Sequence, residues 1–148
     1  MTVDVSTKIV IDRPRTDVSA YAVNPDNAPK WYANITSVEW KTDPPLRVGS
    51  RIAFVAYFLG RRMAYTYEVV ELIHGDRMTM RTAGGPFPME TTYVWESTSD
   101  GRTRMTLQNR GTPSGFSKWM APFMSFAIRR ANRKDLALLK QRLEARAA

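Results

Sequence analysis

The sequence contains no cysteine and a single histidine, His74, among its 148 residues. The missing cysteine excludes disulfide scaffolds, cysteine-ligated zinc and thiol catalysis. A single histidine excludes metal-binding motifs that need two histidines. It leaves one possible imidazole base for a Ser/His/Asp catalytic arrangement. Glycine-rich phosphate-binding motifs are also absent, because Gly84 and Gly85 precede a proline and a strand rather than a helix. We therefore expect neither a cofactor nor a metal.

Long apolar runs are missing as well. No stretch reaches the roughly 18 to 20 residues that a membrane-spanning helix needs. Residues 1–6 include an early acid and alternating apolar residues, which is not the pattern of a signal peptide. We expect a cytoplasmic protein without a transmembrane segment. The remaining composition, 43% hydrophobic and 24% charged, is that of an ordinary globular protein. Without repeats or linkers, residues 1–148 are expected to form a single domain.

The net charge of +8 is concentrated near the end of the chain. Between Lys118 and Arg146 there are eight basic residues and two acidic ones. Exposed aromatic residues interleaved with the basic ones, or a recognised nucleic-acid-binding module, would favour nucleic acid as a partner, and neither is evident. We interpret the basic residues as the solvated face of an amphipathic helix, and do not expect nucleic-acid binding.

Hydrophobic periodicity predicts strands along most of the chain. Residues 3–11 alternate apolar and polar side chains, as a half-buried strand does. Pro14 suits the first turn of a short helix through Tyr21, and residues 24–31 suit a turn and a second short helix. Further strands are predicted at residues 35–40, 49–58, 62–72, around 78–80, 89–96 and 103–109, and a long helix at 116–147. We expect Trp31 to lock the short helices onto the sheet.

This order of elements predicts an α+β fold. About seven antiparallel strands form one curved sheet wrapped around the long C-terminal helix. We expect the first and second strands to be neighbours at the far end of the sheet. If sheet and helix do not meet along their full length, the inward side chains line a cavity.

Several local patterns accompany this order, at residues 9–14, 24–31, 48–51, 59–62 and 135–140. In these patterns and in element order the chain resembles the START-like or Bet v 1-like (SRPBCC) superfamily, and in particular its bacterial polyketide cyclase/dehydrase-like branch. The resemblance implies a helix-grip fold. It also implies binding of lipids, sterols, polyketides or other apolar molecules, while a minority of members catalyse cyclisation, dehydration or hydrolysis. None of the patterns is a catalytic signature.

The inward aromatic and methionine residues form the candidate ligand site. We expect Tyr65, Tyr67 and Tyr93, helped by Asn109, to orient the polar groups of a ligand. The apolar walls are assigned to Met80, Met89, Trp95, Met105, Met120, Phe123 and Met124. A closed core is the alternative, but each inward tyrosine needs a hydrogen-bond partner, and Thr91 and Asn109 add polar groups that a dry core disfavours. Methionine suits ligands of varied shape, although it also fills irregular cores.

Three functions follow from these features. The first is binding of an apolar or amphipathic small molecule between sheet and helix. The second is a cyclase or dehydrase in which a tyrosine polarises a carbonyl. No base for such an enzyme is visible in the sequence. His74 falls in a surface turn, and the strand pattern points three glutamates outward: Glu68, Glu90 and Glu96. The third is a protein-interaction module. It would use residues 116–128, which are apolar on nearly every side and which also suit transient contact with a membrane surface.

Overall fold

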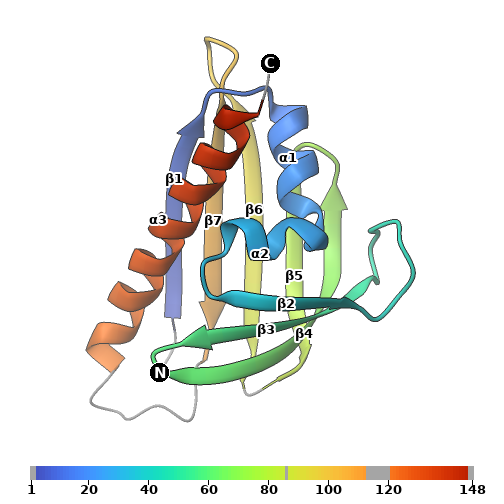
Figure 1. Cartoon of the computed structure of the whole chain (residues 1–148), viewed down its shortest axis with the longest axis vertical. Coiled ribbons are helices and arrows are strands. Elements are labelled where there is room, and N and C mark those ends of the chain that lie inside the picture. The colour runs from blue at the N-terminus through green and yellow to red at the C-terminus, as the bar shows by residue number, and fades with distance from the viewer. Residues whose placement is uncertain (1–2, 86, 113–120, 147–148) are drawn as a thin grey trace.

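The computed structural model describes residues 3–85, 87–112 and 121–146. Within them, seven strands form one antiparallel sheet in the order β1-β7-β6-β5-β4-β3-β2 (Figure 1). The strands are β1 (Val3–Ile11), β2 (Ile35–Trp40), β3 (Arg51–Phe58), β4 (Arg61–Ile73), β5 (Arg77–Gly84), β6 (Met89–Ser97) and β7 (Thr103–Gly111). The helices are α1 (Arg15–Val23), the 3-10 turn η1 (Pro25–Asn27), α2 (Ala28–Trp31) and α3 (Ala121–Ala145).

The predicted α+β helix-grip architecture is confirmed. The sheet curls, and α3 crosses one face of it beside β1, while α1 and α2 lie over the other strands on the same side (Figure 1). The prediction that the first two strands are neighbours is wrong, because β1 pairs with β7 and β2 pairs with β3, at opposite edges of the sheet. The short helices carry the chain across the concave face from one edge to the other, a path that strand patterns alone do not reveal.

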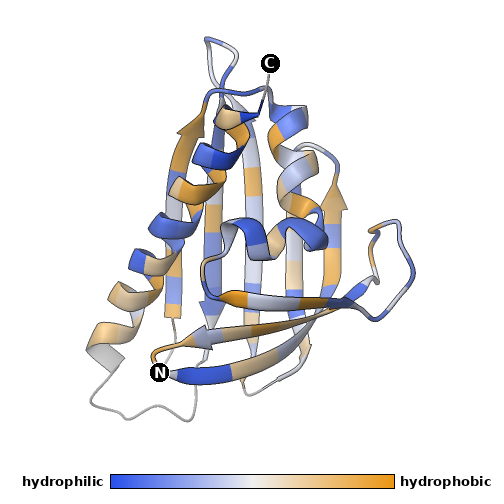
Figure 2. Cartoon of the chain, viewed as in Figure 1, coloured by the Kyte–Doolittle hydropathy of each residue, from blue (hydrophilic) through white to orange (hydrophobic). Residues whose placement is uncertain are grey.

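Hydrophobic and polar residues alternate along β1 and along α3 (Figure 2). The buried stripe of α3 consists of Met124, Ile128, Asn132, Asp135, Leu136, Leu139 and Leu143. Each fully buried leucine contributes roughly 1.5 to 3 kcal/mol relative to an exposed one, so this stripe holds the helix on the sheet. Arg130, Arg133 and Arg142 are exposed on the other side of the helix. The interpretation of the basic residues as a solvated face is confirmed for these positions.

The C-terminal half of α3 closes one end of the molecule. The Arg13 guanidinium donates to the backbone carbonyls of Glu144, at 2.7 Å, and Arg146, at 3.0 Å. The Glu144 carboxylate in turn accepts the backbone N–H of Asp12 at 2.8 Å. These bonds satisfy carbonyl groups that a helix end leaves unpaired, and they tie α3 to the end of β1.

Trp31 fills the space beneath this closed end. It is fully buried, and its ring centroid lies 4.0 Å from that of Tyr32 and 5.8 Å from that of Tyr93. The same core cluster contains Trp95, Met105, Leu107, Leu136 and Leu139. Trp31 therefore joins α2 to both the sheet and α3, which confirms its predicted role as a lock.

Candidate functional site

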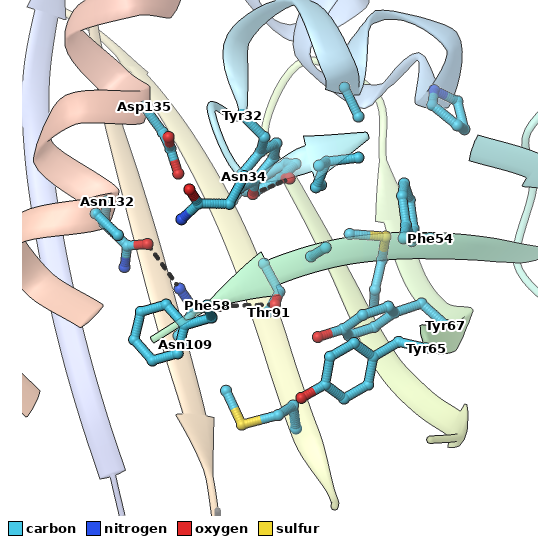
Figure 3. A pocket seen from close by; sticks show the side chains of 18 of the residues that line it. Tyr32, Asn34, Phe54, Phe58, Tyr65, Tyr67, Thr91, Asn109, Asn132 and Asp135 are labelled. Carbon is cyan, nitrogen blue, oxygen red and sulfur yellow. Dashed lines mark hydrogen bonds between the residues drawn. The ribbon is translucent and has the colours of Figure 1, made fainter. Parts of the chain in front are cut away.

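A cavity of about 180 Å³ lies between the N-terminal half of α3, the short helices and the curled sheet (Figure 3). Its walls are mostly apolar. They include the aromatic residues Phe54, Phe58 and Phe87 and the methionines Met63, Met78, Met80, Met89 and Met124. The C-terminal half of α3 packs directly on the sheet. The gap between helix and sheet therefore remains open where the N-terminal half of α3 faces the curved part of the sheet. The cavity expected from the element order is thus present.

Seven of the predicted site residues line this cavity: Tyr65, Tyr67, Met80, Met89, Tyr93, Asn109 and Met124. Trp95 and Met105 do not. Both point inward, at 2% and 0% exposure, but they belong to the closed core around Trp31. Strand alternation identifies the inward face of a strand and not the position along it. These two residues sit where helices cover that face completely.

The prediction that Phe123 forms a wall is wrong. Its side chain is 65% exposed, and that of Phe126 is 61% exposed, whereas Met124 is fully buried and lines the cavity. A shift of one residue turns a helical side chain by about 100°, so the buried stripe passes through Met124 and leaves Phe123 outside it. Met120, also predicted as a wall, lies outside the described residues.

A chain of polar side chains runs along one wall of the cavity. The Thr91 hydroxyl donates to Asn109 Oδ1 at 2.8 Å, and Asn109 Nδ2 donates to Asn132 Oδ1 at 3.1 Å (Figure 3). Asn132 is only 4% exposed, and its own Nδ2 has no hydrogen-bond partner. The Nδ2 atom is itself almost completely buried, so the chain of hydrogen bonds ends inside the protein and not at the cavity surface.

Asp135 lies one turn beyond Asn132 on the same face of α3. Its Oδ1 accepts the backbone N–H of Ala33 at 3.0 Å, which links α3 to the segment after α2. Burial raises the pKa of the Asp135 carboxyl to about 6, while the Ala33 N–H and the Lys134 charge oppose that shift. This carboxyl group therefore changes protonation close to neutral pH.

Four tyrosines line the same space. The hydroxyls of Tyr32 and Tyr93 lie 2.5 Å apart and share a hydrogen bond, and burial raises the pKa of both phenols above the ordinary value. Tyr65 and Tyr67 stand with their ring centroids 5.8 Å apart, and the Tyr65 hydroxyl donates to Met63 Sδ at 3.3 Å. Burial raises the pKa of Tyr67 to about 12 and that of Tyr65 further. All four are therefore neutral hydrogen-bond donors at neutral pH.

Tyr32, Asn132 and Asp135 are among the cavity residues that the sequence candidates did not include. Asn132 and Asp135 follow Ile128 by four and seven residues, which places them on the buried stripe of the last helix. Helical periodicity therefore predicts that both polar side chains are buried, and this pattern could have identified them as candidates from the sequence. Tyr32 has no comparable signal, because its place depends on how α2 packs on the sheet.

The residues judged unsuitable as bases lie away from the cavity. His74 is exposed in the turn between β4 and β5, which confirms the surface assignment. Glu68 pairs with Arg51 and Glu90 with Arg81 and Arg110, on the outer face of the sheet. Within the described residues, no group of three or more histidine, aspartate or glutamate side chains is arranged to hold a metal ion.

Comparison with known protein families identifies the chain. Residues 2–144 match the model of a family described as polyketide cyclase / dehydrase and lipid transport. The protein belongs to this family. A search of curated protein sequences finds no match.

Solved structures agree on the fold. A Thermus thermophilus protein is 20% identical, with a TM-score of 0.80, and the match covers 98% of this chain and 99% of that one. A START superfamily protein from Mycobacterium smegmatis is 11% identical, with a TM-score of 0.81, covering 95% and 97%. The Zhui aromatase/cyclase from a Streptomyces species is 12% identical, with a TM-score of 0.83, covering 99% and 96%. At these identities the likeness concerns the START-like, Bet v 1-like (SRPBCC) fold alone.

Family membership supports hydrophobic-ligand binding or a cyclase-type role in general terms. The resemblance drawn from the sequence is thereby confirmed at the level of superfamily and branch. No helix in the described part of the chain is long and apolar enough to cross a membrane.

Proposed function

We propose that this member of the family binds one apolar small molecule with a polar head in the cavity beneath α3. Tyr65, Tyr67, Tyr93 and Asn109 would orient the polar head. The methionine walls would contact the apolar body, because a flexible thioether adapts to its shape. The observation that carries the proposal is a largely apolar cavity with a few convergent polar groups, those of Tyr65, Tyr67, Tyr93 and Asn109.

The cavity volume indicates the size of the bound group. The cavity measures about 180 Å³. For comparison, an engineered apolar cavity of about 150 Å³ binds benzene. The described cavity is therefore suited to a single aromatic ring with a short substituent, or to the head of a longer molecule.

Native mass spectrometry of the protein purified from its own host, followed by denaturing extraction, tests this proposal. Ala131→Phe places a ring in the cavity, since Ala131 lines it, whereas Ala137→Phe places the same ring on the exposed side of α3. We expect wild type and Ala137→Phe to carry an apolar compound and Ala131→Phe to lose it. Equal occupancy of all three proteins would contradict binding in this cavity.

Asp135 favours a second candidate function, a cyclase- or dehydrase-type enzyme. The sequence analysis found no residue suited to act as a base. Asp135 would supply a base inside the cavity, because its pKa lies close to neutral pH, as general-base catalysis requires. Its carboxylate would remove a proton from the carbon beside a ligand carbonyl. The Tyr67 phenol would donate a hydrogen bond to the resulting enolate oxygen.

Proton exchange tests this second function without knowledge of the natural substrate. In heavy water at pH 8, the enzyme should exchange the methyl protons of acetophenone for deuterium, as followed by NMR. Asp135→Asn should abolish this exchange, and Asp43→Asn, at an exposed carboxyl group in a loop, should leave it unchanged. Exchange by the wild type no faster than in buffer would contradict the enzymatic reading.

A further inference from the structure

The N-terminal half of α3 exposes apolar side chains that the fold does not cover. Phe123 is 65% exposed, and Phe126, about one turn later on the same side of the helix, is 61% exposed. The turn between β3 and β4 lies beside this half of α3, because Phe58 packs against the core cluster that contains Met124. Leu59 in that turn is 45% exposed. We call Leu59, Phe123 and Phe126 the apolar patch.

Leu59 has a backbone conformation that leucine rarely adopts. Its φ is 51°, in the left-handed region, and Gly60 follows with a φ of 77°. Glycine or asparagine fits such a turn position at less cost, because a larger side chain crowds the backbone there. Nearly half of the leucine faces water, so burial within the described fold offsets this cost only in part. An apolar contact outside the protein would favour leucine at this position.

The residues that follow the patch on α3 are basic. Residues 121–134 contain no acidic residue and four basic ones: Arg129, Arg130, Arg133 and Lys134. The last three are exposed. Within the described part of the chain none of the four forms a salt bridge, whereas Lys140 further along the helix pairs with Glu144. Figure 2 shows hydrophobic colour toward the N-terminal end of α3 and hydrophilic segments after it. This half of the helix thus combines an apolar end with positive charge.

We propose that the apolar patch and the basic residues behind it dock this protein on a bilayer that contains anionic phospholipid. The patch enters the boundary between head groups and acyl chains, and the basic side chains contact the phosphate groups. Charge complementarity decides the occupant. A second copy of the chain is disfavoured, because a symmetric contact through this surface brings the same arginines together.

The position of the patch beside the cavity favours a bilayer over an acidic protein. Phe58 and Met124 line the cavity, and they are next in sequence to Leu59 and Phe123. Docking therefore brings the cavity wall against a phase in which an apolar ligand dissolves. This preference rests on the proposed function, whereas the exposure and the charge of the surface do not depend on any ligand.

Sedimentation with lipid vesicles tests the inference without an added ligand. The protein is mixed with vesicles of phosphatidylcholine alone, or of phosphatidylcholine with phosphatidylglycerol. Wild type should bind the anionic vesicles at about 0.15 M salt and the neutral vesicles far more weakly. Most of the binding should be lost at about 1 M salt, because the screening length falls from about 8 Å to about 3 Å.

The apolar contribution is tested with a matched pair of double variants. Phe123→Ala/Phe126→Ala should weaken binding to anionic vesicles by roughly tenfold or more, because two rings no longer enter the bilayer. Val48→Ala/Ile73→Ala, at exposed positions before β3 and at the end of β4, should leave the affinity unchanged. Leu59→Asn suits the left-handed turn and should also weaken binding.

The electrostatic contribution is tested with a second matched pair. Arg130→Gln/Arg133→Gln should weaken binding to anionic vesicles by roughly tenfold to thirtyfold, the effect of two basic residues near the lipid surface. Lys8→Gln/Arg104→Gln removes the same charge from exposed outward positions on β1 and β7. This control should change the affinity by less than about threefold, because its charges lie away from the surface that docks.

The outcomes decide the inference. Absence of binding to anionic vesicles, or equal binding to both kinds of vesicle, would overturn it. Equal losses from the two arginine-and-lysine pairs would show attraction by net charge alone, and would overturn docking through this surface. Ligand binding in the cavity is measured without vesicles, so failure of the docking inference is distinguishable from failure of the proposed function.

Discussion

Replacing Asp135 by asparagine should stabilise the protein above pH 6 and leave its stability nearly unchanged below pH 4. Asparagine has the shape of aspartate and keeps an oxygen that accepts the Ala33 N–H, so the variant removes the charge and little else. Burial raises the pKa of Asp135 from 3.8 to about 6. The folded protein thus holds this proton more tightly than the unfolded chain does, and ionisation of Asp135 destabilises the fold.

The sign and size of the effect follow from this shift. Stability contributed by protonated Asp135 is fully present below pH 3.8 and is lost as the pH rises to about 6. The rise from 3.8 to about 6 corresponds to about 3 kcal/mol, at roughly 1.4 kcal/mol for each tenfold change in proton affinity, and this is the upper limit of the gain for Asp135→Asn. Other carboxylates, such as Glu90 and Glu144, titrate in both proteins, so their effect cancels in the difference.

Urea denaturation of wild type and Asp135→Asn between pH 4 and pH 8 measures this difference. We expect the free energy of unfolding of the variant to exceed that of the wild type by an amount that grows between pH 4 and pH 6 and is constant above. Asp43→Asn, at an exposed loop position, should show no such growth. A difference that is independent of pH, or that falls as the pH rises, would refute the reasoning.

Three further perturbations test other parts of the account. Tyr93→Phe should lower the free energy of unfolding by about 1 to 3 kcal/mol, because the buried Tyr32 hydroxyl loses its partner. The double variant Tyr65→Phe/Tyr93→Phe should bind a polar-headed ligand more weakly, with little further loss of stability. Unchanged affinity would show that these phenols are not part of the site. Leu139→Ala should cost about 2 to 5 kcal/mol in denaturant unfolding, since Leu139 is fully buried, and a loss below 1 kcal/mol would contradict its place in the core. His74→Ala should change stability by less than about 0.5 kcal/mol and leave ligand binding intact, because His74 is an exposed turn residue; a large loss of binding would overturn its surface assignment.

Features that depend on local periodicity could be predicted from the sequence. A two-residue repeat determines which side chains of a strand face inward, so Tyr65, Tyr93 and Asn109 were predicted on the correct face. The same holds for the basic outer face of α3. The order of elements was sufficient for the helix-grip architecture, because a long helix after a run of antiparallel strands has few ways to bury its apolar stripe.

Features that depend on three-dimensional packing could not be predicted in this way. Trp95 and Met105 face inward but lie under a covered part of the sheet, and no pattern within a strand reports that cover. Phe123 and Met124 are adjacent and both apolar, so the exact phase of the stripe is decided by contacts with β1. Tyr32 reaches the cavity only because α2 is held against the sheet.

The central claim is that an apolar molecule with a polar head occupies the cavity beneath α3, and methionine NMR tests it most directly. Met63, Met78, Met80, Met89 and Met124 line the cavity, whereas Met105 is fully buried in the closed core and serves as an internal reference. With labelled methionine methyl groups, titration with acetophenone should shift the five cavity signals in a saturable manner and leave the Met105 signal in place. Five unmoved signals, or a shift of Met105 as large as theirs, would contradict the claim.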